Sequence, residues 1–209
     1  MTHLVLSPHP DDAALSCGGW MFQLVQSGAD VAVFTVMAGA MPADVEMSSF
    51  IEEHIIRWQL GPNPVPSRRA EDQRSVTSLG ATITFGDVPD ALFRTDGQGN
   101  ALYPDLTRLF GPVHPDDPGL REKRAIVARA TGVDVLYVPL GAGGHIDHRL
   151  VRDAVLERRE DLTEVAVFFY EEYPYSADGD DIIDAARDAV GYPLELSLIH
   201  ISEPTRLRR

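Results

Sequence analysis

The sequence predicts an α/β fold, a three-layer sandwich built on a mostly parallel, Rossmann-like sheet. Short apolar runs alternate with segments of helical periodicity through residues 1–170. Polar loops follow two of these runs directly, at residues 7–12 and 141–148. Because open α/β sheets bind ligands at the carboxyl ends of their strands, both loops are expected at one sheet edge, where they would form a metal site.

The individual elements follow from composition and period. Runs rich in β-branched residues predict strands at 4–6, 30–37, 81–85, 133–140 and 165–170. Apolar residues at helical spacing predict helices at 13–27, 51–60, 67–80, 120–130 and 150–159, with Ser67 as the cap of the third. Residues 38–50 are expected to form a mobile loop beside the site, and 86–119 an irregular insertion bordering it.

Bulk composition narrows the protein class. A chain of 209 residues with 44% hydrophobic residues is long enough for one domain with a full core. A formal charge of −14 argues against a nucleic-acid partner. Cys17 is the only cysteine, so no internal disulfide is possible. No apolar run approaches the length of a membrane span, which predicts a cytoplasmic protein without a membrane partner and leaves a homo-oligomer open.

The last fourteen residues do not match the rest of the chain. Residues 196–206, LSLIHISEPTR, resemble the translation of a transposase-based sequencing adapter. We therefore expect residues 1–195 to form a single domain, truncated at its C-terminus, and residues 196–209 to be a non-native tail.

The first polar loop carries candidate ligands and a candidate base. His9 and Asp12 stand three residues apart on a loop stiffened by two prolines, an arrangement that suits a divalent metal such as zinc. Asp11 lies between them and can accept a proton from a metal-bound water. Ordinary helix capping by the aspartates is the alternative interpretation of these residues.

The second polar loop would complete the site. A glycine-rich turn at 141–144 leads to His145, Asp147 and His148. If both strands are parallel, His148 joins His9 and Asp12 as two histidines and one carboxylate, which leaves an open catalytic position. His145 can stabilise an oxyanion or protonate the leaving amine, and Asp147 can hold His145 or His148 in the required tautomer.

These residues resemble a known family. Pro8-His9-Pro10-Asp11-Asp12 after a strand, with His145-Ile146-Asp147-His148 later, is similar to the PIG-L/LmbE family of zinc-dependent N-deacetylases. The helix around Arg68 and Glu71, and the segment 169–175, also resemble that family. The resemblance implies removal of acetyl from an N-acetylglucosamine-type amino-sugar conjugate, with His9, Asp12 and His148 on Zn²⁺, or on Fe²⁺ or another divalent metal. It also implies Asp11 as the general base and His145 as the electrophilic or acid partner. The family usually has Glu after the paired aspartates, where this chain has Ala13.

Other candidates carry weaker signals. Arg68 and Glu71 are three apart on one helical face and could bind substrate hydroxyls or form a structural ion pair. Residues 114–117 repeat the letters His-Pro-Asp-Asp without a preceding strand, so Asp116 or Asp117 is expected to cap the next helix. His3 and His54 lack a partner pattern and are expected in the core or on the surface.

Two further function classes were weighed against a deacetylase. A nucleotide-binding α/β module would need a glycine-rich motif after the first strand, but the loop there is acidic and repels phosphate. A non-catalytic metal-binding protein would have no need of Asp11 and His145, which are both present.

Overall fold

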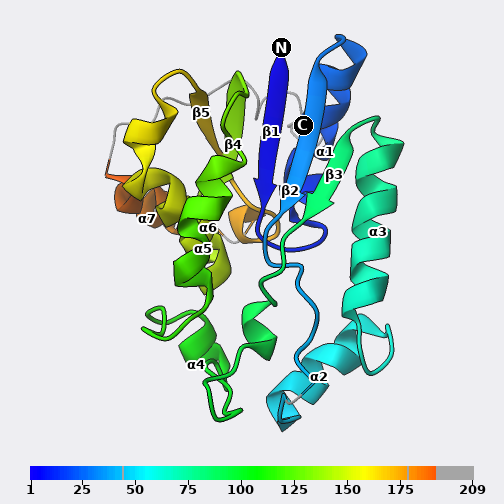
Figure 1. The fold of residues 1–209 in the computed structure, drawn as a ribbon, viewed down its shortest axis with the longest axis vertical. Helices are drawn as coiled ribbons and strands as arrows, with labels where there is room; N and C mark the ends of the chain where they lie inside the picture. Colours follow the sequence, from blue (N-terminus) through cyan, green and yellow to red (C-terminus); the bar gives the residue numbers. More distant parts are fainter. Residues whose placement is uncertain (44, 178, 192–209) are drawn as a thin grey trace.

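The computed structural model describes residues 1–43, 45–177 and 179–191, and these form the expected three-layer α/β fold (Figure 1). One parallel sheet has the strand order β3-β2-β1-β4-β5. Its strands are β1 (Thr2–Ser7), β2 (Asp30–Thr35), β3 (Thr82–Phe85), β4 (Val135–Pro139) and β5 (Ala166–Tyr170). The strand period of two sends Leu4 and Leu6 to the core on one face and Val5 to the core on the other.

Helices cover both faces of the sheet. Helices α1 (Asp12–Gln26) and α3 (Val65–Ser78) pack on the face that contains Val5, while α5 (Gly119–Ala128) and α6 (Ile146–Glu157) pack on the face that contains Leu4. Helices α2 (Ser49–Trp58) and α4 (Leu106–Leu109) lie beyond the arrowheads of the strands (Figure 1). The irregular insertion is confirmed, since residues 86–118 contain only α4 and the 3₁₀ turn Ala91–Phe93.

Some predicted boundaries were wrong. Helix α3 begins at Val65 after Pro64, with a proline in its first turn, so Ser67 lies inside the helix and is not its cap. Helix α6 begins four residues earlier than predicted because the His145 ring accepts a hydrogen bond from the Asp147 amide. Helix α7 (Asp180–Val190) was not predicted; its apolar side buries Ile183 against Leu140. The tail at 196–209 lies outside the described residues.

Strand order fixes the position of the site. β1 pairs with β2 on one side and with β4 on the other, so the connections that leave β1 and β4 run to opposite sides of the sheet. A crevice opens at such a switch point, outside the carboxyl ends of the two strands. The loops that follow β1 and β4 carry His9 and His148, so the topology brings the two halves of the predicted site together. Among the described residues, no helix has the length and apolarity needed to cross a bilayer.

Candidate metal centre and active site

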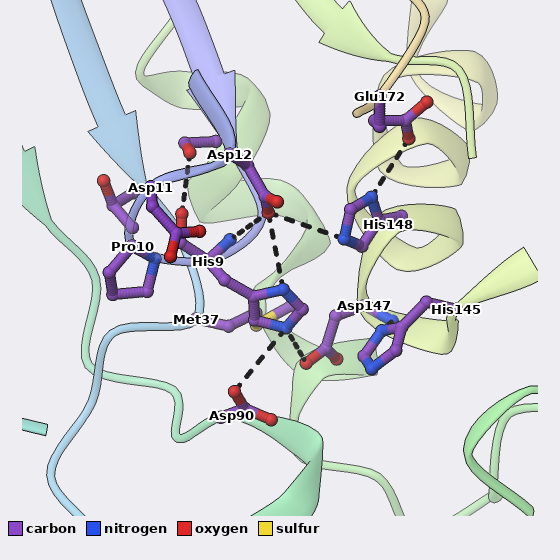
Figure 2. A network of polar contacts seen from close by, with 12 residues as sticks. His9, Pro10, Asp11, Asp12, Met37, Asp90, His145, Asp147, His148 and Glu172 are labelled. Atoms are coloured by element: carbon purple, nitrogen blue, oxygen red, sulfur yellow. Dashed lines mark hydrogen bonds and ion pairs between the residues drawn. The ribbon is translucent and has the colours of Figure 1, made fainter. Parts of the chain in front are cut away.

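The three predicted metal ligands meet at the ends of β1 and β4 (Figure 2). Asp12 Oδ2 lies 3.4 Å from His9 Nδ1 and 3.4 Å from His148 Nε2. Ligand atoms held at 2.0–2.2 Å from zinc in a tetrahedron are separated by roughly 3.3–3.6 Å. All three side chains are buried, and the two separations from Asp12 Oδ2 have the length of a tetrahedral edge around zinc.

A second acidic group faces the other nitrogen of His9. The Nε2 atom of His9 lies 2.9 Å from Asp147 Oδ2 and 3.9 Å from Asp90 Oδ2 (Figure 2). His9, Asp90 and Asp147 therefore bring possible ligand atoms within 4.8 Å of one another, as do His9, His145 and His148. The 2.9 Å separation is a hydrogen-bond distance and is shorter than a tetrahedral edge, so the Nε2 side fits a metal less well. Burial lowers the pKa of His9, but the carboxylates around it raise that pKa well above its ordinary value, so the surroundings favour positive charge.

Asp11 occupies an unusual backbone position between the two predicted ligands of the first loop. It precedes α1 with φ 91° and ψ −27°, a conformation that non-glycine residues rarely adopt. Its amide donates to Asp72 Oδ1 at 3.2 Å, and Asp72 in turn accepts the Thr35 hydroxyl at 2.8 Å. This buried support on β2 and α3 turns the Asp11 side chain into the pocket, where it is 58% exposed.

The pocket alters the acidity of Asp11. Loss of hydration among the surrounding protein atoms raises the pKa of its carboxyl to about 6, and the nearby Asp12 charge acts in the same direction. The guanidinium of Arg68, 3.7 Å away, opposes this shift. A carboxylate with a raised pKa is a better proton acceptor than an ordinary surface aspartate.

The carboxylate of Asp147 contacts a different histidine from the two, His145 and His148, that the sequence offered. This carboxylate contacts His9 Nε2, and it also accepts from the Ala91 amide at 3.0 Å. The Arg94 guanidinium lies 2.6 Å from its other oxygen. Burial alone would raise the pKa of Asp147, but Arg94 holds it well below its usual range. The carboxylate thus remains charged and fixes the orientation of His9.

His148 is oriented by a carboxylate to which the sequence analysis gave no role. Glu172 is fully buried, and its Oε1 lies 3.1 Å from His148 Nδ1. The same carboxylate accepts the amides of Gly141 at 2.7 Å and Ala142 at 3.2 Å, which ties the glycine-rich turn to the segment after β5. This contact leaves His148 Nε2 facing Asp12, as a metal ligand requires. The sequence signals for Glu172 were its position just after the last strand and the family resemblance of segment 169–175, neither of which assigns it a contact.

His145 caps α6 and faces the pocket. Its Nδ1 accepts a hydrogen bond from the Asp147 amide at 3.2 Å, so the neutral ring carries its proton on Nε2. Burial and the neighbouring His9 lower the pKa of His145 to about 3, which keeps the ring neutral. A neutral ring with an Nε2 proton can donate a hydrogen bond to a developing oxyanion.

The buried side chains of His9, Asp12, His145 and His148 form the floor of a pocket of about 360 Å³, within the size range of small-molecule sites. Arg68 lines this pocket, where it lies 3.4 Å from Asp90 Oδ2 and 4.6 Å from the centre of the Trp58 ring. Glu71 is exposed and does not line the pocket, and Arg68 pairs with Asp90 instead. His54, which the sequence did not connect to the site, also lines it.

Comparison with known proteins places the chain in a family. The family model for PIG-L, described as GlcNAc-PI de-N-acetylase, matches residues 4–158. The chain belongs to the PIG-L family. It is 30% identical over 197 residues to a 2'-N-acetylparomamine deacetylase from Streptomyces fradiae, an alignment that covers 90% of this chain. The chain spans 63% of the length of that relative.

Solved structures agree with this assignment. A crystal structure of a deacetylase from the biosynthesis pathway of teicoplanin has a TM-score of 0.73 and 25% identity, covering 91% of this chain and 83% of the other. The A40926 pseudoaglycone deacetylase has a TM-score of 0.65 and 25% identity, covering 90% of this chain and 79% of the other. This member of the PIG-L family therefore resembles the structures of two deacetylases over most of its length.

Proposed function

We propose that this PIG-L protein is a metal-dependent hydrolase that removes the acetyl group from an N-acetylglucosamine-type unit of an amino-sugar conjugate. The observation that carries the proposal is the position of Asp11, an exposed carboxylate beside a buried His9–Asp12–His148 set with zinc-like spacing. The relative that deacetylates 2'-N-acetylparomamine supports an acetamido sugar as substrate.

The donor set fits a resident divalent cation. His9, Asp12 and His148 would hold Zn²⁺, or Fe²⁺ or another divalent ion, because imidazole and carboxylate are suitable ligands for these metals. Such an ion supplies Lewis-acid polarisation and lowers the pKa of bound water from 15.7 to about 7. Glu172 and Asp147 hold the two histidine rings in the orientations that this set requires.

The remaining residues divide the proton and charge chemistry between them. Asp11 accepts the proton of the attacking water and can return it to the departing amine. His145 donates its Nε2 proton in a hydrogen bond to the oxygen of the former amide carbonyl as negative charge develops there. Arg68 lies at the wall of the same pocket, where its guanidinium can donate to sugar hydroxyls. The products are acetate and a free amino sugar.

Acetate release by metal-reconstituted protein tests this function. Chelator-treated protein should be inactive, and one equivalent of Zn²⁺, or of Fe²⁺ without oxygen, should restore hydrolysis of an N-acetylglucosamine conjugate. Acetate and primary amine should then appear in equal amounts. Absence of amine with every divalent metal, or amine formation that is unaffected by the chelator, would refute the proposed function.

A further inference from the structure

The mouth of the pocket differs chemically from its floor, and we propose that it binds an apolar group carried by the amino sugar. This inference rests on the proposed function and specifies its substrate class. The expected substrate is an acetamido sugar with an aromatic or aliphatic aglycone, in preference to a free sugar or to a sugar attached to a polycationic aglycone.

Exposed apolar side chains from separate parts of the fold gather at this opening. Leu15 of α1 is 55% exposed, Leu106 of α4 is 57% exposed, and Tyr173 after β5 is 52% exposed. Phe110, just after α4, is 37% exposed, and all four side chains line the pocket. Single exposed leucines are common on proteins, but apolar residues that converge on one opening are typical of a binding surface.

An aromatic wall joins this mouth to the reacting groups. The Phe110 ring lies 5.4 Å from the His145 ring and 6.4 Å from the Tyr175 ring, centre to centre. Tyr175 in turn lies 5.7 Å from the ring of His148. A group bound against Phe110 would therefore be adjacent to a sugar whose acetamide reaches the floor, so the apolar surface is continuous with the catalytic pocket.

The charged groups of the pocket pair with one another. Asp11 and Asp90 lie 3.7 Å and 3.4 Å from the Arg68 guanidinium, and Asp12 lies 3.4 Å from His9. Within the described part of the chain, no glutamate or lysine lines the pocket, although the full sequence has a formal charge of −14. A polycationic aglycone would have to compete with Arg68 for Asp11 and Asp90, whereas an apolar aglycone would bury the exposed apolar side chains of the mouth.

Three substrates that share one sugar test the inference. They are free N-acetylglucosamine, its phenyl β-glycoside and its aminoethyl β-glycoside, assayed with metal-reconstituted protein. The phenyl glycoside should have a kcat/KM at least about tenfold above the other two, mainly through a lower KM. Equal kcat/KM values, or a preference for the aminoethyl glycoside, would overturn the inference.

Variants at the mouth assign the selectivity to its residues. Leu106→Asp and Phe110→Ala should each bring the ratio of kcat/KM for the phenyl glycoside to kcat/KM for the free sugar close to one. Ile56→Asp is the matched control, because Ile56 is 72% exposed on α2 and does not line the pocket. Selectivity that survives both mouth variants, or that Ile56→Asp removes equally, would overturn the inference. A change of oligomeric state in Leu106→Asp without a change of substrate selectivity would also overturn the inference, because the mouth would then be a contact between copies of the chain.

A binding measurement separates this inference from the proposed function. Titration calorimetry of the metal-free protein with phenyl β-D-glucosaminide and with free glucosamine needs no turnover. Tighter binding of the phenyl compound, lost in Leu106→Asp, would support the apolar mouth even if no acetate were ever released. Equal binding of both compounds, with turnover intact, would reject the mouth and leave the deacetylase proposal standing.

Discussion

The letters His-Pro-Asp-Asp occur twice in this chain, and the fold uses the two copies differently. The copy at 9–12 follows the buried strand β1, so its side chains enter the crevice beside β4. The copy at 114–117 lies in the irregular segment between α4 and α5. There Asp116 has a side chain that is 73% exposed. Residue type alone therefore does not make a site; the strand end that presents the residues does.

The second copy nevertheless supports the first. Asp117 accepts the Gly119 amide at 2.7 Å, so its carboxylate binds the first N–H group of α5, although the N-cap residue is Pro118 rather than the predicted aspartate. The same buried carboxylate accepts from Arg94 Nη1 at 2.9 Å, and Arg94 also contacts Asp147, the residue that orients His9. A chain of buried charges thus runs from Asp117 through Arg94 and Asp147 to the loop that carries His9. Matched substitutions in the two copies can separate these roles.

The largest expected difference is in metal content. His9→Ala should bind much less than one equivalent of Zn²⁺, because one of three protein ligands is lost. His114→Ala should retain a full equivalent, because that ring lies outside the pocket. Elemental analysis after dialysis measures both. One full equivalent in His9→Ala would remove this residue from the ligand set.

The aspartates that follow the prolines should differ in catalysis. Asp11→Asn should keep near-stoichiometric metal but lose about 10²–10⁴ in kcat, the usual effect of removing a general base. Asp116→Asn should leave kcat unchanged. Steady-state rates of acetate release, measured together with metal content, test both predictions. Loss of metal in Asp11→Asn would instead make Asp11 a ligand, and near-normal kcat would transfer the base role to His145.

The pH dependence provides an independent check on Asp11. Only the deprotonated carboxylate accepts a proton, and the pKa of Asp11 is raised to about 6. The rate should therefore rise with pH through the titration of this carboxyl, and that acidic limb should disappear in Asp11→Asn. An identical acidic limb in the variant would assign it to another group.

Asp117 should matter for stability rather than for chemistry. Asp117→Asn leaves the buried Arg94 with one carboxylate partner fewer, and breaking a buried ion pair typically costs about 3–5 kcal/mol. Asp116→Asn should change the free energy of unfolding by less than about 0.5 kcal/mol, as expected for an exposed position. Urea unfolding compares the two. A change below about 1 kcal/mol in Asp117→Asn would show that Arg94 does not need this partner.

A smaller effect is expected from the carboxylate behind His148. Glu172→Gln removes the charged partner of its Nδ1 and should weaken zinc affinity by about 10–100-fold. The neighbouring Glu171 pairs with Arg187 away from the pocket, so Glu171→Gln should bind zinc like the parent protein. Competition with a fluorescent chelator measures both affinities. Equal affinities for the two variants would show that Glu172 holds the loop but does not tune the metal.

The sequence predicted the parts of the site that strand ends determine. His9, Asp12 and His148 could be named because each follows a recognisable apolar strand, and parallel strands end at one edge. The partners Arg94 for Asp147 and Glu172 for His148 could not be named, because each contact joins residues on different elements. Their geometry depends on how the irregular insertion and the segment after β5 fold back over the sheet. The role of Asp72 was not predicted, although Asp72 adjoins Glu71 in the sequence. Which of the two carboxylates is buried depends on the side of α3 that packs against the sheet.

The position of a bound zinc ion tests the central claim most directly, because His9 presents a different acidic group to each of its ring nitrogens. Crystals grown with Zn²⁺ and measured at the zinc absorption edge would locate the ion by anomalous scattering. We expect one strong anomalous peak, placed among His9 Nδ1, Asp12 Oδ2 and His148 Nε2 and beside Asp11. A peak on the Nε2 side of His9, between Asp90 and Asp147, would contradict this expectation.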